Sequence, residues 1–248
     1  TARGDRMKLA GARALVTGAS SGIGAATVTR LAAQGAEPLL VGRNKAALDK
    51  VDGAALSVDL GRPGAAQEIA DWAGRVDLLV CNAGVGWAGD LAEQDLAAIG
   101  ELVTVNLTAH LELARLLLPG MVARGSGHLV LVSSIAGCLG VADEAVYAAT
   151  KAAMRTFADS VRLATAKAGV GVTVVVPGVV DTPFFSRRGR PYDRTRPKPV
   201  PADDVAAALV AAVLRDRSEV FVPAWLRFPA RLHGALPGLV FRLQRRFG

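Results

Sequence analysis

Tyr147 and Lys151 are two titratable side chains that the stretch YAATK places four residues apart. If this alanine-rich stretch is helical, both side chains lie on one face. The ordinary pKa of tyrosine is near ~10, and a neighbouring ammonium group favours the phenolate and lowers that pKa. Such a pair can exchange a proton with a substrate oxygen. The ordinary alternative is a surface lysine beside a half-buried tyrosine.

A glycine-rich stretch, TGASSGIG at residues 17–24, is suited to binding phosphate. Its glycines allow a tight turn, a close approach of backbone to a pyrophosphate, and close packing of the next helix on a sheet. The first turn of that helix offers free N–H groups and a partial positive charge. We predict that a dinucleotide binds here, at Gly18, Ser20, Ser21, Gly22, Ile23 and Gly24.

The elements that must position these residues alternate between strand and helix. Runs of Val, Leu and Ala bounded by Gly, Pro or Asp predict strands. The expected strands are 12–18, 37–42, 54–59, 77–84, 127–134, 170–178 and 219–223. The expected helices are 22–34, 45–50, 65–73, 94–123, 147–167 and 203–215, the fourth of them divided into two near Asn106.

The strands are continuously apolar, as expected when helices cover both faces of a sheet. The alternation therefore predicts an α/β protein with a single doubly wound, Rossmann-type parallel sheet over residues 1–223. Within it, the Pro- and Arg-rich segment at about 183–201 is expected to be a mobile substrate loop. Residues 224–248 form a basic, amphipathic C-terminal extension.

The motifs, taken in order, resemble those of the short-chain dehydrogenase/reductase family over nearly the whole chain to about residue 223. The turn at 17–24 is followed by Asp59, Asn82-Ala83-Gly84, Asn106, Ser134, Tyr147-x-x-x-Lys151, Pro177-Gly178 and Thr182. Cys81 stands where the family usually has the first Asn of Asn-Asn-Ala-Gly, which is a mild departure at a structural position. Each motif is weak alone, but their joint order and spacing make the resemblance specific.

The resemblance implies a catalytic role for four residues. Tyr147 would be the general acid in reduction and the general base in oxidation, and Lys151 would also hold the nicotinamide ribose. Ser134 would hydrogen-bond the substrate oxygen. Asn106 would mark a break in its helix and carry a water that links Lys151 to solvent.

The resemblance also implies contacts with a nicotinamide cofactor outside the glycine-rich turn. Asp59 would meet the adenine amino group, with a cap or turn role as the alternative, and Val180 and Thr182 would bind the carboxamide. The remaining expected cofactor contacts are Leu60, Asn82, Ala83, Gly84, Tyr147, Lys151, Pro177 and Gly178.

The end of the second strand distinguishes the two nicotinamide cofactors. An NAD enzyme needs an acid there for the ribose 2′-hydroxyl, whereas this chain has Gly42, Arg43 and Asn44. The planar guanidinium of Arg43 is suited to a 2′-phosphate. NADP(H) is therefore the expected cofactor, with a plain solvated arginine as the alternative.

Trp87, Leu139, Val141, Phe184 and Phe185 are the residues expected to flank the nicotinamide. Because they are apolar, we expect a small apolar ketone, aldehyde or alcohol as substrate. The expected function is an NADP(H)-dependent oxidoreductase of carbonyl and hydroxyl groups, and the alternative is a non-catalytic NADP(H)-binding sensor or scaffold. The resemblance further implies a homodimer or homotetramer, with the helices at 106–124 and 147–167 as the interface.

Composition narrows the remaining classes of function. Hydrophobic residues make up 51% of the chain and the mean hydropathy is +0.33, which indicates a globular protein. Two cysteines and three scattered histidines indicate neither a disulfide framework nor a metal site. No apolar run reaches the ~18 residues of a membrane span, and residues 1–8 do not resemble a signal sequence, so we expect a cytoplasmic protein.

The net charge of +7 is concentrated near the C-terminus. Residues 1–186 hold 16 Lys and Arg against 17 Asp and Glu, whereas residues 187–248 hold 13 against 5. Nucleic-acid binding is not expected, because the basic region lacks interleaved aromatics and a known reading motif.

The tail at 225–248 has apolar residues at helical spacing with arginines between them, and Pro229 and Pro237 should divide it. Packing on the domain or a partner subunit, and docking on an anionic membrane, both stay open.

Overall fold

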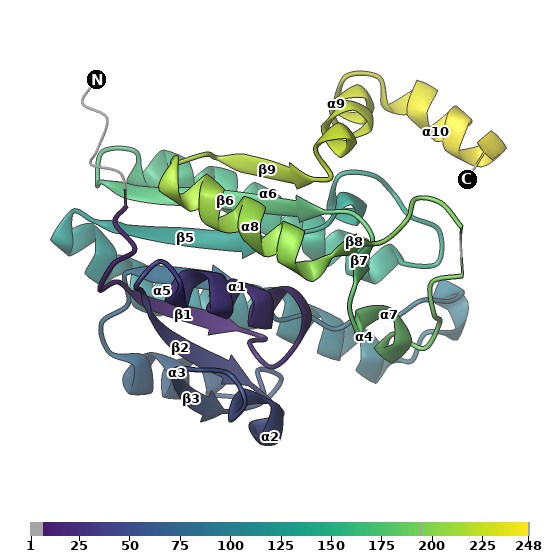
Figure 1. Cartoon of the computed structure of the whole chain (residues 1–248). Coiled ribbons are helices and arrows are strands. Elements are labelled where there is room, and N and C mark those ends of the chain that lie inside the picture. The colour runs from purple at the N-terminus through teal and green to yellow at the C-terminus, as the bar shows by residue number, and fades with distance from the viewer. Residues whose placement is uncertain (1–6, 194, 248) are drawn as a thin grey trace.

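A seven-stranded parallel sheet with helices on both faces forms the body of the protein, as the computed structural model shows (Figure 1). The structure describes residues 7–193 and 195–247. The strand order is β3-β2-β1-β4-β5-β6-β9. The strands are β1 (Arg13–Thr17), β2 (Glu37–Gly42), β3 (Ala54–Ser57), β4 (Leu78–Cys81), β5 (Gly127–Val132), β6 (Val170–Pro177) and β9 (Glu219–Val222). All seven lie within the ranges that the sequence predicts, and the predicted fold class is confirmed.

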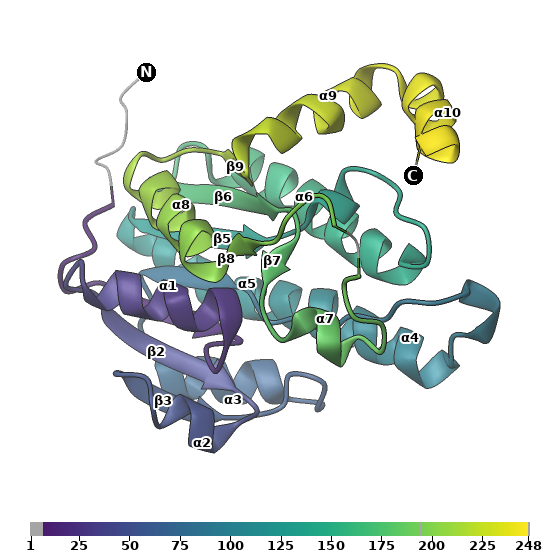
Figure 2. The same ribbon diagram turned by 45° about the vertical axis from the view of Figure 1, so that its right-hand side comes forward.

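Helices join consecutive strands and cover both sides of the sheet (Figure 2). They are α1 (Gly22–Ala32), α2 (Lys45–Leu48), α3 (Ala65–Ala73), α4 (Leu96–Val103), α5 (Ala109–Arg124), α6 (Ala145–Thr165) and α8 (Ala202–Leu214). Short 3-10 turns occur at Leu91–Glu93, Ile135–Gly137 and Ala224–Leu226. The order reverses at β1, so the carboxyl ends of β1 and β4 flank the crevice in which such sheets bind ligands.

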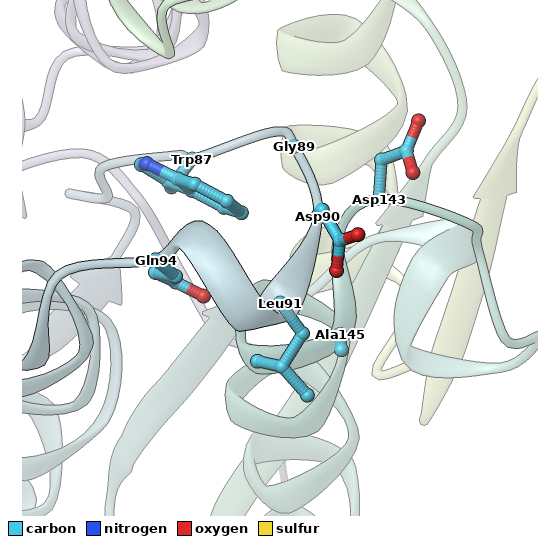
Figure 3. Close-up of a pocket in the computed structure, with 7 residues that line it drawn as sticks. All are labelled: Trp87, Gly89, Asp90, Leu91, Gln94, Asp143 and Ala145. Atoms are coloured by element: carbon cyan, nitrogen blue, oxygen red, sulfur yellow. The ribbon is translucent and has the colours of Figure 1, made fainter.

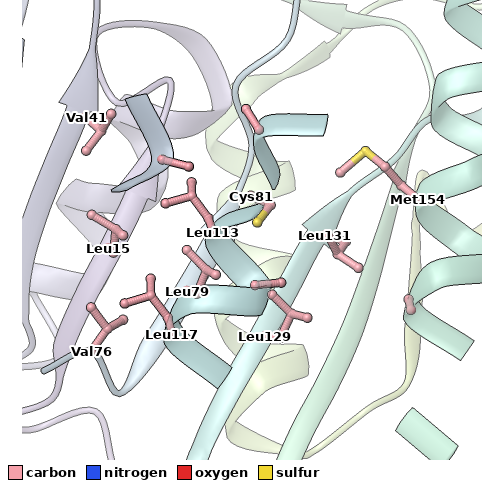
Figure 4. Close-up of a cluster of buried hydrophobic side chains, with 14 of the residues drawn as sticks. Leu15, Val41, Val76, Leu79, Cys81, Leu113, Leu117, Leu129, Leu131 and Met154 are labelled. Carbon is pink, nitrogen blue, oxygen red and sulfur yellow. The ribbon is translucent and has the colours of Figure 1, made fainter. Parts of the chain in front are cut away.

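Two apolar layers explain why the strands are apolar throughout. Successive strand residues point to opposite faces, so Leu15 lies in the layer under α3, α5 and α6, while Val16 lies in the layer under α1 and α8. Figure 4 shows part of the first layer, where Leu79 and Leu131 from the sheet meet Leu113 of α5. Cys81 is buried in this layer.

A π-helical turn at Thr104–Thr108 joins α4 to α5, so the predicted break near Asn106 is confirmed. The helical stretch Leu96–Arg124 is continuous and, by length and composition alone, is apolar enough to cross a membrane. The stretch is not an unbroken apolar run, because it contains Glu101, His110 and Glu112. Leu113 and Leu117 of this stretch pack in the core, and a core helix passes the same test.

The segment after β6 contains short elements of secondary structure. It contains the two-stranded ladder of β7 (Val180–Asp181) with β8 (Val200–Pro201), and between them the short helix α7 (Phe184–Arg187). The tail forms α9 (Arg227–Ala235) and α10 (Pro237–Phe247). Pro237 begins α10, but Pro229 does not divide the tail, because it lies in the first turn of α9, where its missing N–H costs no helical bond.

Candidate active site

The turn between β1 and α1 is packed so closely that it requires glycine at several positions. A Cβ on Gly24 would lie 2.2 Å from the Gly18 carbonyl oxygen, so no side chain fits there. Gly18 itself has φ +69°, a conformation that favours glycine. Ser21 is the N-cap of α1 and makes no side-chain cap hydrogen bond with the described part of the chain. The first-turn amides of α1 therefore point into the crevice beside β1 and β4, where they can bind phosphate.

Thr17 and Asn82 tie this turn to the end of β4. The Thr17 hydroxyl accepts hydrogen bonds from the backbone N–H groups of Asn82 (2.9 Å) and Ala83 (3.0 Å). The Asn82 side chain donates to the Thr17 carbonyl oxygen at 2.9 Å. The predicted cofactor residues Asn82 to Gly84 thus lie against the glycine-rich turn, with the Asn82 amide engaged in holding the two strand ends together.

Arg43 lies at the end of β2 with its guanidinium half exposed. Its Nη1 atom is 3.9 Å from Asp59 Oδ2 and 3.7 Å from Glu101 Oε1. Asp59 also accepts a hydrogen bond from the Gly61 N–H at 2.9 Å, which is the turn role that the sequence analysis kept as an alternative. Asp59 thus combines a local turn with a position beside Arg43.

The other predicted cofactor residues lie around the same crevice, with one qualification. A Cβ on Gly22 would be 2.9 Å from Thr182 Cγ2, so Thr182 lies directly beside the glycine-rich turn. Val180 pairs with Val200 in the small ladder, and Gly178, which follows Pro177, donates its N–H to the Val222 carbonyl oxygen. Leu60 buries its side chain in the core, so only its backbone is available to a ligand.

Ser134, Tyr147 and Lys151 converge at the carboxyl end of β5. The Ser134 hydroxyl hydrogen-bonds the phenol of Tyr147, and the Ser134 oxygen accepts from the Ala136 N–H at 3.1 Å. Lys151 Nζ lies 5.8 Å from the centre of the Tyr147 ring and donates to the Val132 carbonyl oxygen at 3.0 Å. Helical spacing on α6 thus does bring the two titratable groups to one face, beside the serine that follows β5.

Burial governs the charge states of these groups. It raises the pKa of Tyr147 above its ordinary value, and the hydrogen bond from Ser134 opposes this only in part. Burial lowers the pKa of Lys151 to about 8. The charge of a neighbouring lysine lowers the pKa of a tyrosine, whereas desolvation raises it. In the protein without cofactor, desolvation is the larger effect, so the pKa of Tyr147 is raised and not lowered as the sequence predicts.

Asn106 lies buried in the π-helical turn beside the loop that follows β4. Its side chain accepts from the Val85 N–H at 2.8 Å and donates to the Val85 carbonyl oxygen at 2.9 Å. A Cβ on Gly84 would lie 3.3 Å from Asn106 Oδ1 and 3.5 Å from Lys151 Nζ. The carboxamide therefore fixes this loop against the lysine, and a Cβ at position 84 would be in tight contact with the carboxamide oxygen.

His110 is a buried residue of this network that the sequence analysis left unassigned. Its Nδ1 is 3.2 Å from the Asn106 carbonyl oxygen, and its Nε2 is 3.2 Å from the Thr17 hydroxyl. A carbonyl only accepts, so Nδ1 carries the proton. Burial lowers the pKa of His110 to about 3, so the ring is neutral and Nε2 can share the Thr17 proton with the Val80 carbonyl oxygen, which lies 3.3 Å from the same hydroxyl. The spacing of four residues from Asn106 was the one available signal in the sequence.

A cavity of about 300 Å³ opens ahead of α6, between the loop after β4 and the residues before Tyr147 (Figure 3). Trp87, which the sequence placed here, forms one wall, and it packs with Phe184 in the apolar cluster around Tyr147. Gln94 also lines the cavity; it is 8% exposed, and its Nε2 has no hydrogen-bond partner in the described part of the chain. The complete lining is Trp87, Gly89, Asp90, Leu91, Gln94, Asp143 and Ala145. Three of these residues are polar, namely Asp90, Gln94 and Asp143.

Arginines of the 183–201 segment hold it against the site. Arg188 is buried, forms an ion pair with Glu144 and stacks over the Phe185 ring at 4.6 Å. Arg190 pairs with Asp143 at 2.8 Å, and Arg187 Nη1 is 3.4 Å from the Ser21 hydroxyl. The predicted loop therefore spans from the glycine-rich turn to the cavity. No sequence pattern pairs these residues, because the partners come from distant elements.

Comparisons with known proteins agree with this geometry. A family model described as short chain dehydrogenase matches residues 12–193. The ketoacyl reductase HetN of Nostoc sp. is 34% identical over 232 residues, covering 86% of this chain and 79% of that protein. A short-chain dehydrogenase from Sphingobium yanoikuyae in complex with NADPH has a TM-score of 0.83 at 30% identity, covering 92% of this chain and 94% of that one. A short chain dehydrogenase/reductase from Burkholderia phymatum in complex with NAD has a TM-score of 0.84 at 23% identity, covering 94% and 96%.

Proposed function

Because the chain belongs to the short-chain dehydrogenase/reductase family, we propose that it is an NADP(H)-dependent oxidoreductase that interconverts a carbonyl and a hydroxyl group on a small apolar substrate. The family supports the broader statement, an oxidoreductase with a nicotinamide cofactor. The choice of NADP(H), the substrate class and the residue roles are our proposal. The observation that carries it is the convergence of Ser134, Tyr147 and Lys151 beside the glycine-rich turn.

The crevice fits a dinucleotide by its shape and by its donors. The Gly18–Gly24 approach excludes side chains, and the first turn of α1 presents N–H groups to a pyrophosphate. Arg187 adds a positive charge close to Ser21. The bound nicotinamide would supply hydride chemistry at a carbonyl carbon.

The chain's own residues would manage the proton and the substrate oxygen. Tyr147 donates a proton to that oxygen in reduction, and Ser134, already bonded to the phenol, orients the same oxygen. The raised pKa of Tyr147 keeps the phenol protonated at neutral pH, which is the form that reduction requires. Lys151 holds its ammonium group near the ring, and Asn106 keeps the loop at Gly84 in place. A scaffold protein would have no need of this convergence.

The preference for NADP(H) rests on Arg43. Its guanidinium lies at the end of β2 beside Asp59, where a 2′-phosphate of the adenosine ribose would be placed. Its ion-pair distances of 3.7 and 3.9 Å to Glu101 and Asp59 are long, and all three side chains are half exposed. A phosphate can therefore compete for the guanidinium at little cost. Relatives of this fold are described with either cofactor, so the local chemistry decides the proposal.

Steady-state kinetics with NADPH and NADH over a panel of ketones, aldehydes and alcohols test this proposal. We expect kcat/KM to be higher with NADPH, and Arg43→Ala to weaken NADPH binding about 10- to 100-fold, the effect of losing a charge-assisted bond. NADH binding should be unchanged in that variant. Arg62→Ala removes an exposed arginine that pairs with Glu68 and is the matched control. Equal efficiency with NADH would contradict the cofactor assignment.

A further inference from the structure

The tail formed by α9 and α10 lies outside the two apolar layers of the domain. Both views show it at the end of the molecule toward which the strand arrows point, beyond β9 (Figures 1 and 2). Leu226 and Ala230 attach its beginning to the core, and Val240 of α10 is buried where the two helices contact each other. The tail is thus fixed to the body at one end, and most of its surface faces outward.

Large apolar side chains of the tail remain exposed. Phe228 and Leu232 are four residues apart and lie on one side of α9, and Trp225 precedes Phe228 by three residues in the 3-10 turn that leads into this helix. Among the side chains of this region that the structure describes, the exposed large apolar ones are Trp225, Phe228, Leu232, Leu236, Leu239, Phe241 and Leu243. Exposed large apolar residues elsewhere in the described chain are spread over several elements. A concentration of this kind marks a surface for interaction.

The charges on the tail all have one sign. The sequence has no acidic residue after Glu219, whereas residues 224–248 contain five arginines. Arg227 stacks over Phe228, with its guanidinium carbon 4.8 Å from the ring centre. The apolar surface is therefore accompanied by positive charge, which is the pattern of helices that bind at the surface of anionic membranes.

We propose that residues 224–248 dock the protein on an anionic membrane surface. Lipid hydrocarbon would take the exposed apolar side chains, and lipid phosphates would take the arginines. A second copy of this chain fits less well, because two such tails repel and residues 1–186 carry a net charge of only −1, from 16 basic and 17 acidic residues. The tail lies at the end of the sheet that holds the candidate site, so an apolar substrate could enter from lipid; that consequence alone depends on the proposed function.

Vesicle sedimentation of the full chain tests this proposal. Vesicles of phosphatidylcholine alone are compared with vesicles of equal parts phosphatidylcholine and phosphatidylglycerol. We expect the protein to sediment with the anionic vesicles and to be released by high salt, because the screening length falls from ~10 Å at 0.1 M to ~3 Å at 1 M. Activity is not used as a readout, so the result is independent of the proposed reaction.

Two pairs of substitutions separate charge from apolar contact. Arg242→Gln with Arg245→Gln should weaken binding to anionic vesicles about 30-fold, since each basic residue contributes about 1 kcal/mol. Lys50→Gln with Arg215→Gln removes the same charge from exposed sites on the body and should change nothing. Phe241→Gln with Leu243→Gln should weaken binding about tenfold or more per side chain. Leu96→Gln, at a leucine of α4 that is more exposed than Phe241 and Leu243, is the control for these apolar substitutions.

The outcomes are distinct. Salt-sensitive binding that the tail substitutions weaken and the body substitutions leave intact supports the proposal. Equal binding to both kinds of vesicle, or none to either, overturns it. If the protein stays in the supernatant and the Phe241 and Leu243 substitutions instead lower the mass measured by light scattering, the tail is a contact between copies and the membrane proposal is wrong.

Discussion

At the scale of single residues, the site combines groups whose charge states are set by burial. Tyr147 and Lys151 are each less than a tenth exposed. Burial raises the pKa of Tyr147 and lowers that of Lys151, so it favours the neutral form of both side chains. A neutral phenol hydrogen-bonded to Ser134 is a proton donor held in place before a substrate arrives. The substitutions below test whether this donor, and the buried amide of Gln94, act on the substrate.

Tyr147→Phe should preserve cofactor binding and lose turnover. The phenyl ring keeps its contact with Phe184, whose ring centre is 5.4 Å away, but no longer carries a transferable proton. We expect kcat to fall about 10²- to 10⁴-fold, with the NADPH dissociation constant unchanged in a fluorescence titration. Tyr192→Phe, which removes a hydroxyl bonded to the Pro197 carbonyl oxygen, is the matched control. A Tyr147→Phe variant with a wild-type rate would show that another group supplies the proton.

Gln94→Met should stabilise the protein and impair catalysis. In the free protein the buried Nε2 is unsatisfied, and removing such a group relieves a cost of about 1–3 kcal/mol, which raises the melting temperature. We expect the same amide to donate to a polar atom of the substrate in the cavity, so kcat/KM should fall about tenfold. Gln67→Met, at an exposed glutamine bonded to Asp71, should change neither quantity greatly. A higher melting temperature with unchanged kcat/KM would leave Gln94 outside substrate binding.

At the scale of elements, His110 connects three parts of the site. Through Thr17 it holds the end of β1 and the loop after β4, and through the Asn106 carbonyl it holds the π-helical turn before α5. The π-helical turn and the neutral histidine thus belong to one arrangement. Because the ring must be neutral to accept from Thr17, this connection has a pH dependence that can be measured.

Acid should destabilise the protein through His110 and His128. Burial lowers their pKa values to about 3 and about 4 in the folded state, below the ordinary value of 6.5, so between these limits the unfolded chain binds more protons. Stability is therefore complete above pH ~6.5 and falls as the pH decreases. In denaturant unfolding between pH 4 and 6, His110→Gln should reduce the slope by about 1.4 kcal/mol per pH unit. A slope unchanged in His110→Gln would refute the assignment.

At the scale of the whole molecule, α5 and α6 offer a surface for assembly. Val122 of α5 is exposed, and Leu163 of α6 is 82% exposed, although both belong to otherwise well-packed helices. We therefore expect a homodimer or homotetramer by light scattering at micromolar concentration. Leu163→Arg should lower the mass, whereas Leu96→Arg, at a residue of α4 that is 81% exposed, should not. A monomer mass for the unmodified chain would contradict this expectation.

The order of elements and the glycine-rich turn could be predicted from the sequence alone. Runs of apolar residues, helical spacing and glycine positions act over a few residues, so they can be read without knowing the fold. The seven strands, the break at Asn106 and the shared face of Tyr147 and Lys151 were predictable for this reason. The boundary at Pro237 was predictable as well, whereas the effect of Pro229 depended on its place within the helix.

The contacts between distant elements could be seen only in the tertiary structure. The unpaired amide of Gln94, the bond of His110 to Thr17 and the ion pair of Arg188 with Glu144 join residues that no local pattern relates. Whether the pKa of Tyr147 is raised or lowered could also not be predicted without the fold, because desolvation depends on everything that packs around the ring. Local propensities select the elements, but the path of the loops and the packing of side chains determine which polar groups are buried and which partners they find.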